Sequence, residues 1–285
     1  MTALNMPPQQ LISSQVKLAL IEDVGQGDLT ADLIDAATQT TAAIITREDM
    51  TLCGQAWVNE VFKQLDPNIT ITWHSNDGDK ISANSTLCQL HGSARVLLTG
   101  ERTAMNFIQT LSATATLCRR YADSVKDLPV QLLDTRKTIP GYRHAQKYAV
   151  RCGGCYNHRI GLYDGILIKE NHIEATGSIN AAITLARRLH PTIAVEIEVE
   201  NLIELEQALT AKADIILLDN FTLADLEKAV NINHDQAKLE ASGGIDLDNV
   251  HEIAQTGVER ISVGALTKDI KAIDLSMRFS RSFSA

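Results

Sequence analysis

Long apolar stretches are missing from this sequence. No window approaches the roughly 18 apolar residues of a membrane-spanning helix, and the balance of 45% hydrophobic and 21% charged residues is ordinary for a soluble globular protein. The opening MTALNMPPQQ has no basic region followed by an apolar run, so nothing in it indicates secretion or import. We therefore expect a soluble, cytoplasmic protein with no membrane partner.

A general surplus of basic residues is also missing. The formal net charge is -9 and the pI is near 5.4, which argues against nucleic acid as a partner because such binding needs a large basic surface. Positive charge is concentrated locally in DTRKTIPGYRHAQKYAVRCGGCYNHR, residues 134–159, against Asp134 as the single acid. A small anionic ligand fits this pattern better. Within the stretch, Lys147 and Arg151 fall on a predicted helix, and we expect them at the surface.

Cysteines are few and irregularly spaced. The count of five is odd, which suits reduced thiols rather than a disulfide framework. Cys152 and Cys155, with His158 shortly after, resemble half of a zinc site. A structural zinc site needs four ligands, and no second CxxC or HxxxH follows. The sequence favours ordinary thiols beside a glycine turn.

Short β-branched runs alternate with amphipathic stretches from about residue 130 onward. This alternation is typical of repeated βα units around a parallel sheet. The last repeats are only about 21 to 23 residues long, which favours a barrel or part of one. The expected strands are 130–134, 165–169, 194–200, 214–219, 238–242 and 260–264. The expected helices are 178–190, 201–212, 222–230 and 247–257.

The first part of the chain has a different pattern, which predicts a separate α+β unit. We expect helices at 9–24 and 99–125, and strands within 42–49 and 69–81. At 285 residues the chain is long enough for two domains with proper cores. No low-complexity linker separates the two patterns, so the boundary is expected within or near the helix at 99–125.

Acidic residues gather at the carboxyl ends of two predicted strands. In AVEIEVE, alternation places Glu196, Glu198 and Glu200 on one face. Such a row is not tolerated in a packed core unless the acids are paired or bound to a cation, although a solvated edge remains open for Glu196 or Glu200. Asp219 ends the next strand. Glu198 and Asp219 together suit Mg2+ with its waters, or ligand hydroxyls.

Cations gather at the same edge. Arg136 and Lys137 follow one strand end, and His158 and Arg159 precede the strand that ends at Lys169. Active sites of α/β barrels are built at this edge, and Arg offers a planar fork for carboxylate or phosphate. Clustered unpaired cations are costly unless an anion completes the site, so we expect an anion pocket here.

Two glycine turns follow the last predicted strands. ASGGI contains Gly243 and Gly244 after Ser242, and SVGAL contains Gly264. Backbone amides in such turns hold phosphate, and a phosphate site is common after the last two strands of a barrel. The sequence thus predicts an acid pair, a phosphate-binding site and a cationic pocket. Together these suit the transfer of a phosphoribosyl group to a small polyanion.

Several sequence motifs resemble those of quinolinate phosphoribosyltransferase, the carboxylating nicotinate-nucleotide pyrophosphorylase. These motifs are EDVGQGDLT, GERTAMNF, DTRKTIPGYR, NHR, LIKENHI, EIEVEN, LLDN, SGGI and SVGALT. The resemblance implies an α/β sandwich domain at 1–110, joined by the tail at 266–285, and an incomplete, open, about seven-stranded β/α barrel at 111–265. It also implies a homodimer with shared active sites, and the decarboxylating transfer of phosphoribosyl pyrophosphate to quinolinate in NAD synthesis.

The same resemblance assigns roles to residues of this chain. Lys137, Glu198 and Asp219 would be catalytic, and the two acids would meet Mg2+ and the ribose hydroxyls. Quinolinate would be bound by Arg102 of the neighbouring subunit with Thr135, Arg136, Lys137, His158, Arg159 and Lys169. Phosphoribosyl pyrophosphate would be bound by Glu198, Asp219, Ser242, Gly243, Gly244, Ser262, Val263, Gly264 and Ala265.

Two alternatives stay open at this point. One is a related phosphoribosyltransferase that accepts nicotinate without decarboxylation, although six cationic groups are more than a monoanion needs. The other is a noncatalytic anion-binding or sensor protein, which would need one of the catalytic positions to be lost. The sequence favours quinolinate because none of those positions is lost.

Overall fold

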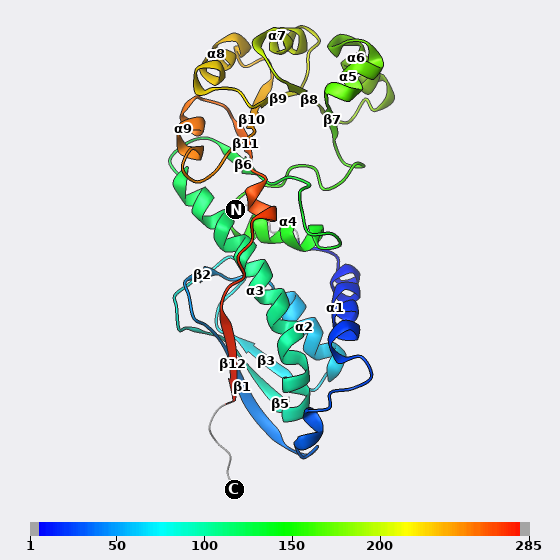
Figure 1. Cartoon of the computed structure of the whole chain (residues 1–285), viewed down its shortest axis with the longest axis vertical. Coiled ribbons are helices and arrows are strands. Elements are labelled where there is room, and N and C mark those ends of the chain that lie inside the picture. The colour runs from blue at the N-terminus through cyan, green and yellow to red at the C-terminus, as the bar shows by residue number, and fades with distance from the viewer. Residues whose placement is uncertain (1–5, 280–285) are drawn as a thin grey trace. The chain divides into compact units, whose positions relative to one another are not determined.

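The computed structural model describes residues 6–279, and the chain forms two compact units (Figure 1). The first unit comprises Met1–Leu117, His144–Gly154 and Ile270–Ala285. The second comprises Cys118–Arg143 and Cys155–Asp269. The predictions for the first five residues and for 280–285 lie outside the described residues.

The first unit is built on an antiparallel sheet. Its strands alternate between buried and more exposed positions, as in β1, where Ala42, Ile44 and Thr46 are buried. In sheet order the strands are β12 (Leu275–Phe279), β1 (Gln39–Thr46), β5 (Thr86–Ser93) and β3 (Thr70–Trp73). A second, two-stranded sheet pairs β2 (Met50–Thr51) with β4 (Lys80–Ile81).

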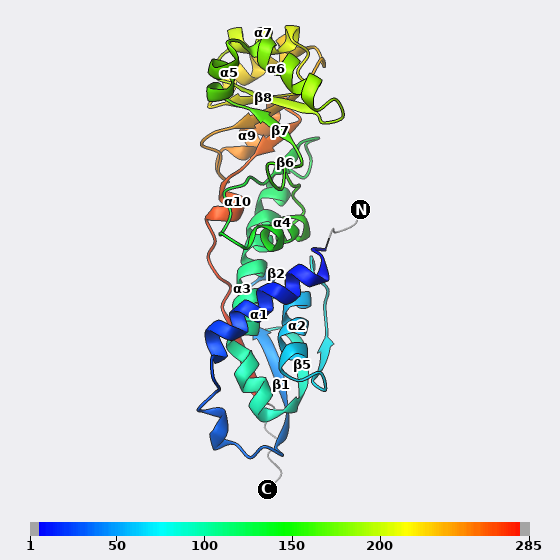
Figure 2. The ribbon, with the colours of Figure 1, turned by 90° about the vertical axis from the view of Figure 1, so that its right-hand side faces the viewer.

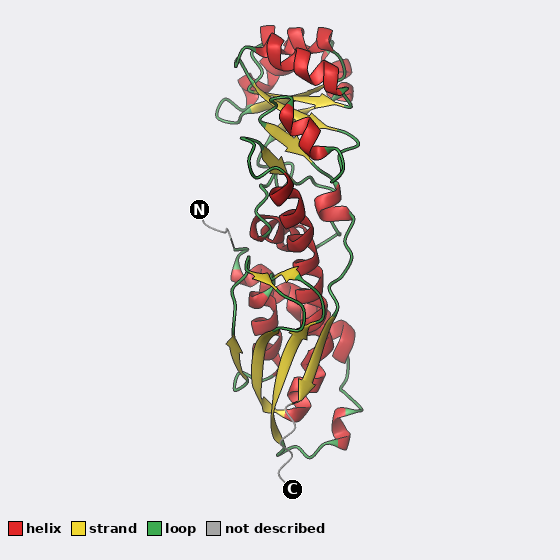
Figure 3. Cartoon of the chain, turned by 90° about the vertical axis from the view of Figure 1, so that its left-hand side faces the viewer, coloured by secondary structure: helices red, strands yellow, loops and turns green. Residues whose placement is uncertain are grey.

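Helices cover one face of the four-stranded sheet (Figures 2 and 3). The covering elements are α2 (Gln55–Leu65) and the first part of α3 (Ala94–Ser124), and α1 (Gln9–Val24) packs against α2. A short 3-10 helix, η1, spans Ala31–Leu33. The helix predicted at 9–24 is confirmed, and the one predicted at 99–125 begins earlier, at Ala94. Trp57, Phe62 and Ile12 are fully or almost fully buried and form part of this core.

Helix α4 (Arg143–Cys152) belongs to the first unit from His144 onward. Its Tyr148 hydroxyl donates to Asp77 Oδ2 at 2.9 Å, and its ring lies 5.9 Å from that of Trp57. Lys147 on this helix is only 3% exposed, so the expected surface position of Lys147 was wrong. The helix predicted to carry Lys147 and Arg151 is present, but its packing partners come from sequence-distant segments.

The second unit contains a six-stranded, entirely parallel sheet. A parallel bridge between Leu133 and Tyr156 extends it beyond its first edge strand. Among the described residues the two edge strands, β6 and β7, are not paired with each other, so the barrel is open. The predicted incomplete barrel is confirmed. In sheet order the strands are β6 (Gln131–Leu133), β11 (Arg260–Ser262), β10 (Lys238–Ser242), β9 (Ile215–Asp219), β8 (Val195–Val199) and β7 (Ile166–Ile168).

Helices follow these strands and begin at capping residues. Ser178, Asn201 and Thr222 each accept a hydrogen bond from the backbone N–H three residues on, which fixes where α6, α7 and α8 begin. Because all six strands are parallel, their carboxyl ends lie at one edge of the sheet. The helices are α5 (Glu170–Thr176), α6 (Ile179–Leu189), α7 (Leu202–Thr210), α8 (Leu223–Asn233), α9 (Val250–Gln255) and α10 (Ala265–Lys268).

Strand β8 shows why acids enter the barrel interior. Its apolar residues, such as Ile197, are fully buried on the face that α6 and α7 cover. Period-two alternation then turns Glu196 and Glu198 to the opposite face. Glu196 is only 4% exposed, so a solvated edge was the wrong interpretation for it, whereas Glu200 is exposed.

Candidate active site

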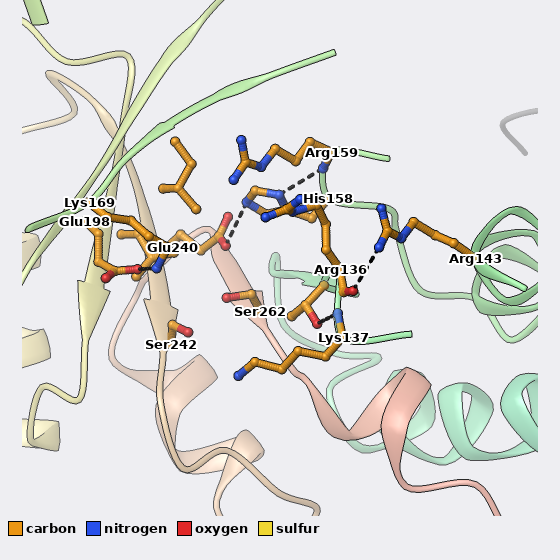
Figure 4. Close-up of a pocket in the computed structure, with 13 residues that line it drawn as sticks. Arg136, Lys137, Arg143, His158, Arg159, Lys169, Glu198, Glu240, Ser242 and Ser262 are labelled. Atoms are coloured by element: carbon orange, nitrogen blue, oxygen red, sulfur yellow. Dashed lines mark hydrogen bonds and ion pairs between the residues drawn. The ribbon is translucent and has the colours of Figure 1, made fainter. Parts of the chain in front are cut away.

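A pocket of about 450 Å³ opens at the carboxyl ends of the barrel strands (Figure 4). We call it the cationic pocket, because most of its charged side chains are basic. It is lined by Thr135, Arg136, Lys137, Arg143, His158, Arg159, Leu167, Lys169, Glu198, Leu217, Glu240, Ser242 and Ser262. The sequence-predicted cations of the second unit are therefore brought together.

A second pocket, of about 580 Å³, contains both glycine turns, and we call it the glycine-turn pocket. Thr135, Lys137, Ser242 and Ser262 line both pockets, so the two are continuous. Its other lining residues are Asp219, Asn220, Gly243, Gly244, Ile245, Asp246, Gly264, Ala265, Lys268 and Asp269. Val263, predicted to bind phosphate, is fully buried and does not line it.

Lys137 is held where the two pockets meet. The hydroxyl of Thr267 donates to the Lys137 carbonyl at 2.8 Å, and the Lys137 amide donates to the Thr135 hydroxyl at 3.0 Å. The aliphatic part of Lys137 lies against Gly264, where an added Cβ would be 3.3 Å from Lys137 Cδ. Its ammonium group can therefore serve an anion in either pocket.

Arg143 was not predicted as a site residue, and it ties the surrounding loops together. Its guanidinium donates to the Thr138 hydroxyl at 3.1 Å, the Ile160 carbonyl at 3.1 Å and the Arg136 carbonyl at 3.4 Å. Most of its donors are thereby used on the loops that carry Arg136 and Arg159. Its place within the motif DTRKTIPGYR was the available signal.

Arg159 points its guanidinium into the cationic pocket (Figure 4). One donor, Nη1, is used on the Gly165 carbonyl at 3.2 Å. Burial, followed by the charge of Arg136, lowers the pKa of Arg159. The positive charge of Arg159 is therefore unfavourable in the free protein, and an anion that binds in the pocket would stabilise it.

Lys169 and Glu198 form an ion pair through Nζ and Oε2. The expectation that all clustered cations are unpaired was therefore wrong for Lys169. Glu198 and Asp219 lie on neighbouring strands, where Glu198 is opposite Leu217 and alternation turns Asp219 to the same face. Glu198 lines the cationic pocket and Asp219 the glycine-turn pocket, so their carboxylates flank the region between an acceptor site and a phosphate site.

The glycine turn after β10 packs closely on the loop after β9. Gly243 has φ +98°, and a Cβ there would lie 2.1 Å from Asn220 Oδ1 and 2.9 Å from its backbone nitrogen. Only glycine fits this position. This turn does not lead directly into a helix, since α9 begins at Val250, whereas Gly264 immediately precedes α10.

Comparison with known proteins identifies the family. The model of the quinolinate phosphoribosyl transferase N-terminal domain matches residues 28–112, and that of the C-terminal domain matches residues 114–278. The chain belongs to the quinolinate phosphoribosyl transferase family. The two matches together cover most of the chain.

Individual members of this family are similar over nearly their whole length. The Bacillus subtilis protein named "Probable nicotinate-nucleotide pyrophosphorylase [carboxylating]" is 42% identical, covering 90% of this chain and 89% of that protein. The tobacco "Quinolinate phosphoribosyltransferase [decarboxylating] 1b" is 36% identical, covering 95% and 83%. The solved nicotinate-nucleotide pyrophosphorylase of Francisella tularensis is 51% identical, with a TM-score of 0.96 over 98% of this chain and all (100%) of that one.

Two sets of sequence-predicted residues are not gathered at the site in the single chain. Arg102, expected from the family resemblance to serve a neighbouring subunit, is exposed on α3 in the first unit. Of the residues considered for zinc, Cys152 lies with Cys53 and Asp77 in the first unit. Cys155 instead donates to a backbone carbonyl in the second unit, at 3.3 Å.

Glu240 is a second charged residue of the pocket lining, besides Arg143, that the sequence analysis did not predict. It is fully buried, yet it lines the cationic pocket. The alternation that turned Glu198 inward applies equally to β10, where Glu240 and Ser242 share a face. The run KLEAS contains a single acid, whereas AVEIEVE contains a row of three, so the local signal for an inward acid is weaker in β10. Within the described residues, no helix is long and apolar enough to cross a membrane.

Proposed function

We propose that this protein transfers the phosphoribosyl group of phosphoribosyl pyrophosphate to quinolinate, with release of pyrophosphate and CO2, giving nicotinate mononucleotide for NAD synthesis. The names of its close relatives support this reaction. The observation that carries the proposal is the continuity of the two pockets. One offers cations to a small polyanion, and the other offers glycine turns to a phosphate.

The cationic pocket suits a ring that bears two carboxylates. Arg136, Lys137, Arg159 and Lys169 all line it, and Glu198 neutralises only Lys169. Two carboxylates can be met by two arginine forks, with the lysines as point charges. Thr135 adds a hydroxyl donor. A monoanion would leave most of this charge uncompensated, which favours quinolinate over nicotinate as the acceptor.

The glycine-turn pocket suits the 5-phosphate of the donor. The turns at Gly243, Gly244 and Gly264 let the backbone approach a phosphate closely. Lys137 lies between the two pockets and would orient the donor against the acceptor. Positioning of this kind supplies large rate factors without any protein nucleophile.

The reaction then follows from charge. The bond from ribose C1 to pyrophosphate breaks with its electron pair leaving on pyrophosphate, and Glu198 and Asp219 stabilise the positive charge that develops at C1. The quinolinate nitrogen attacks C1. The positive charge of the quaternary nitrogen so formed stabilises the carbanion left on the adjacent ring carbon when its carboxylate departs as CO2, and a proton then adds to that carbon. Decarboxylation should therefore follow transfer.

We propose Mg2+ as the metal. The carboxylate oxygens of Glu198 and Asp219 are hard donors of the kind Mg2+ prefers, with waters and substrate phosphates completing its coordination. When bound, Mg2+ would balance the charge of the leaving pyrophosphate. For Glu198 to contribute, its ion pair with Lys169 must loosen, which would free the Lys169 ammonium for quinolinate.

We further propose a homodimer in which each active site receives Arg102 from the partner chain, acting in the cytoplasm. Arg102 is exposed on α3 and is not among the residues that line the cationic pocket of its own chain. Exposed apolar side chains on the first unit, such as Leu18 and Leu33, provide surface that association would bury. The five cysteines are present as thiols, which suits a reducing compartment.

Incubation with quinolinate, phosphoribosyl pyrophosphate and Mg2+ tests the proposal. Nicotinate mononucleotide and CO2 should appear in equal amounts, with nicotinate a poor substitute for quinolinate. Absence of both products would refute the proposal, and turnover of nicotinate without CO2 would point to the nondecarboxylating alternative. Sharing of sites is tested by mixing Arg102→Ala with Asp219→Ala chains, because a heterodimer would regain one intact site. No recovery in proven heterodimers would contradict sharing.

A further inference from the structure

Three buried carboxylates surround His158 beside the cationic pocket. Asp134 and Glu240 are 0% exposed, and Glu196 is 4% exposed. Acidic side chains are almost never fully buried unless they are paired. An anion pocket also gains nothing from negative charge nearby, so these acids need another reason to be there. Their hydrogen bonds provide one.

The polar atoms of His158 are engaged within the protein. Its backbone N–H donates to Asp134 Oδ1 at 2.9 Å, and Nδ1 accepts from the backbone N–H of Arg159 at 2.8 Å. Nε2 lies 3.0 Å from a carboxylate oxygen of Glu196. It lies 3.4 Å from Glu240 Oε1 (Figure 4). In this arrangement both ring nitrogens are directed at groups of the protein.

The hydrogen bond from Arg159 decides the form of the ring. A backbone N–H can only donate, so Nδ1 must carry a lone pair, and the ring proton must sit on Nε2, facing the acids. Burial lowers the pKa of His158, but the hydrogen bond and charge of Glu196, together with the charge of Glu240, raise it by more. Protonation of Nδ1 would nevertheless break the hydrogen bond that Nδ1 accepts from the Arg159 backbone N–H.

Glu240 has a separate anchor. Arg260 Nε donates to Glu240 Oε2 at 2.8 Å, which leaves Glu240 Oε1 for the region around His158 and Glu196. Burial, followed by the charge of Glu196, raises the pKa of Glu240. A protonated Oε1 would be a donor toward Glu196, and an amide nitrogen at that position would reproduce the same donor.

Arg159 is fixed at both ends by these contacts. Its backbone N–H is held by the His158 ring, and its Nη1 is held by the Gly165 carbonyl at 3.2 Å. Asn157 Nδ2 donates to Asp134 Oδ2 at 2.7 Å, which ties the same turn to the end of β6. The direction of the guanidinium therefore depends on the orientation of the His158 ring.

We propose that His158 is a positioning residue, whose neutral ring aims Arg159 and does not itself bind the dicarboxylate. Glu240, together with Glu196, is a positioning residue that holds the ring. The inference rests on the proposed function for its ligand, quinolinate, but its structural part concerns only the ring and its neighbours. Partners that orient a binding group in this way commonly change affinity by one to two orders of magnitude.

The first test does not depend on measuring the activity of any variant. In protein labelled with 15N at histidine, long-range 1H–15N spectra at neutral pH should show one protonated and one unprotonated nitrogen for His158. A His158→Gln sample assigns the signal among the eight histidines. A ring protonated on both nitrogens, or protonated on Nδ1 alone, would overturn the proposal even if the enzyme reaction is as proposed.

The second test asks whether Glu240 acts through Arg159. Glu240→Ala should raise the KM for quinolinate about tenfold or more, with the KM for phosphoribosyl pyrophosphate within about twofold. Glu240→Gln should recover most of the loss, since its amide reproduces a protonated acid. In an Arg159→Lys background, Glu240→Ala should add little. Fully additive losses, or equal losses for both substrates, would count against the proposal.

Lys238→Ala is the matched control. Lys238 lies on the same strand as Glu240, but its side chain is exposed and pairs with Glu259 at 2.9 Å. Its removal should leave both KM values unchanged, and the thermal midpoint of every variant shows whether it folds. If the native protein fails to convert quinolinate, the proposed function falls, while the spectra still decide the role of His158.

Discussion

Arg159 offers the sharpest perturbation of the cationic pocket. Its guanidinium uses Nη1 on the Gly165 carbonyl, so the remaining N–H groups can form a two-pronged contact with a carboxylate. Truncating one partner of a hydrogen-bonded charge pair costs about 2–5 kcal/mol when the pair is buried. Arg159 is only half-buried, so the lower part of that range applies, about 2–3 kcal/mol. At about 1.4 kcal/mol per factor of ten, Arg159→Ala should weaken quinolinate binding about 30- to 150-fold.

The fold should not suffer from the same substitution. Burial and the charge of Arg136 lower the pKa of Arg159, so the free protein holds this charge at a cost. The unfolding free energy of Arg159→Ala should therefore stay within about 1 kcal/mol of the native value. The affinity of Arg159→Lys for quinolinate should lie between that of the native protein and that of Arg159→Ala, because lysine keeps the charge but loses the two-pronged guanidinium contact.

Titration calorimetry with quinolinate measures the affinity, and urea denaturation measures the stability. Arg188→Ala is the control, since Arg188 is an exposed arginine on α6 away from the pocket lining. A Kd for Arg159→Ala within threefold of the native Kd would refute the reasoning. So would an equal loss in Arg188→Ala, because the effect would then reflect net charge alone.

Three further predictions concern other parts of the chain. Gly243→Ala should abolish phosphoribosyl pyrophosphate binding in calorimetry, because the added Cβ would lie 2.1 Å from Asn220 Oδ1. The control is Gly177→Ala, where φ is +89° but nothing lies within 4 Å of the added Cβ, and this variant should bind phosphoribosyl pyrophosphate normally. The five thiols should react with a thiol reagent only after denaturation, since all are buried and burial raises the pKa of Cys88 to about 12; rapid native labelling would contradict this. Burial raises the pKa of Asp77 above 3.8, so its contribution to stability is lost as pH rises through that raised pKa. Asp77→Asn should therefore gain stability relative to the native chain in urea melts as pH rises from about 4 to about 8, and a constant difference would contradict the assignment.

Local patterns were enough for much of the barrel. The strand ends at Asp219 and Ser242 were placed correctly, because apolar runs and capping residues such as Asn201 and Thr222 are local signals. The strand alternation also placed Glu198 on the interior face. These features depend on residues close in sequence, and so they can be read without the fold.

Other features depended on partners far apart in sequence. The side chain of Lys147 is buried on a helix that returns to the first unit, and nothing in the local charge pattern indicated this. Lys169 pairs with Glu198, and Glu240 lies beside His158, because parallel strands bring their carboxyl ends together. Such pairings are set by strand order, which no single motif contains.

The sequence by itself determined which chemical groups this protein offers, namely clustered cations, carboxylates and glycine turns at strand ends. It also determined the family, because those motifs occur in a fixed order. Only the tertiary structure decided which cations face a ligand and which are used internally. His158 shows the difference, since its ring nitrogens are directed to Arg159 and the buried acids. The physical reason is that hydrogen-bond direction and burial are properties of the packed arrangement rather than of residue type.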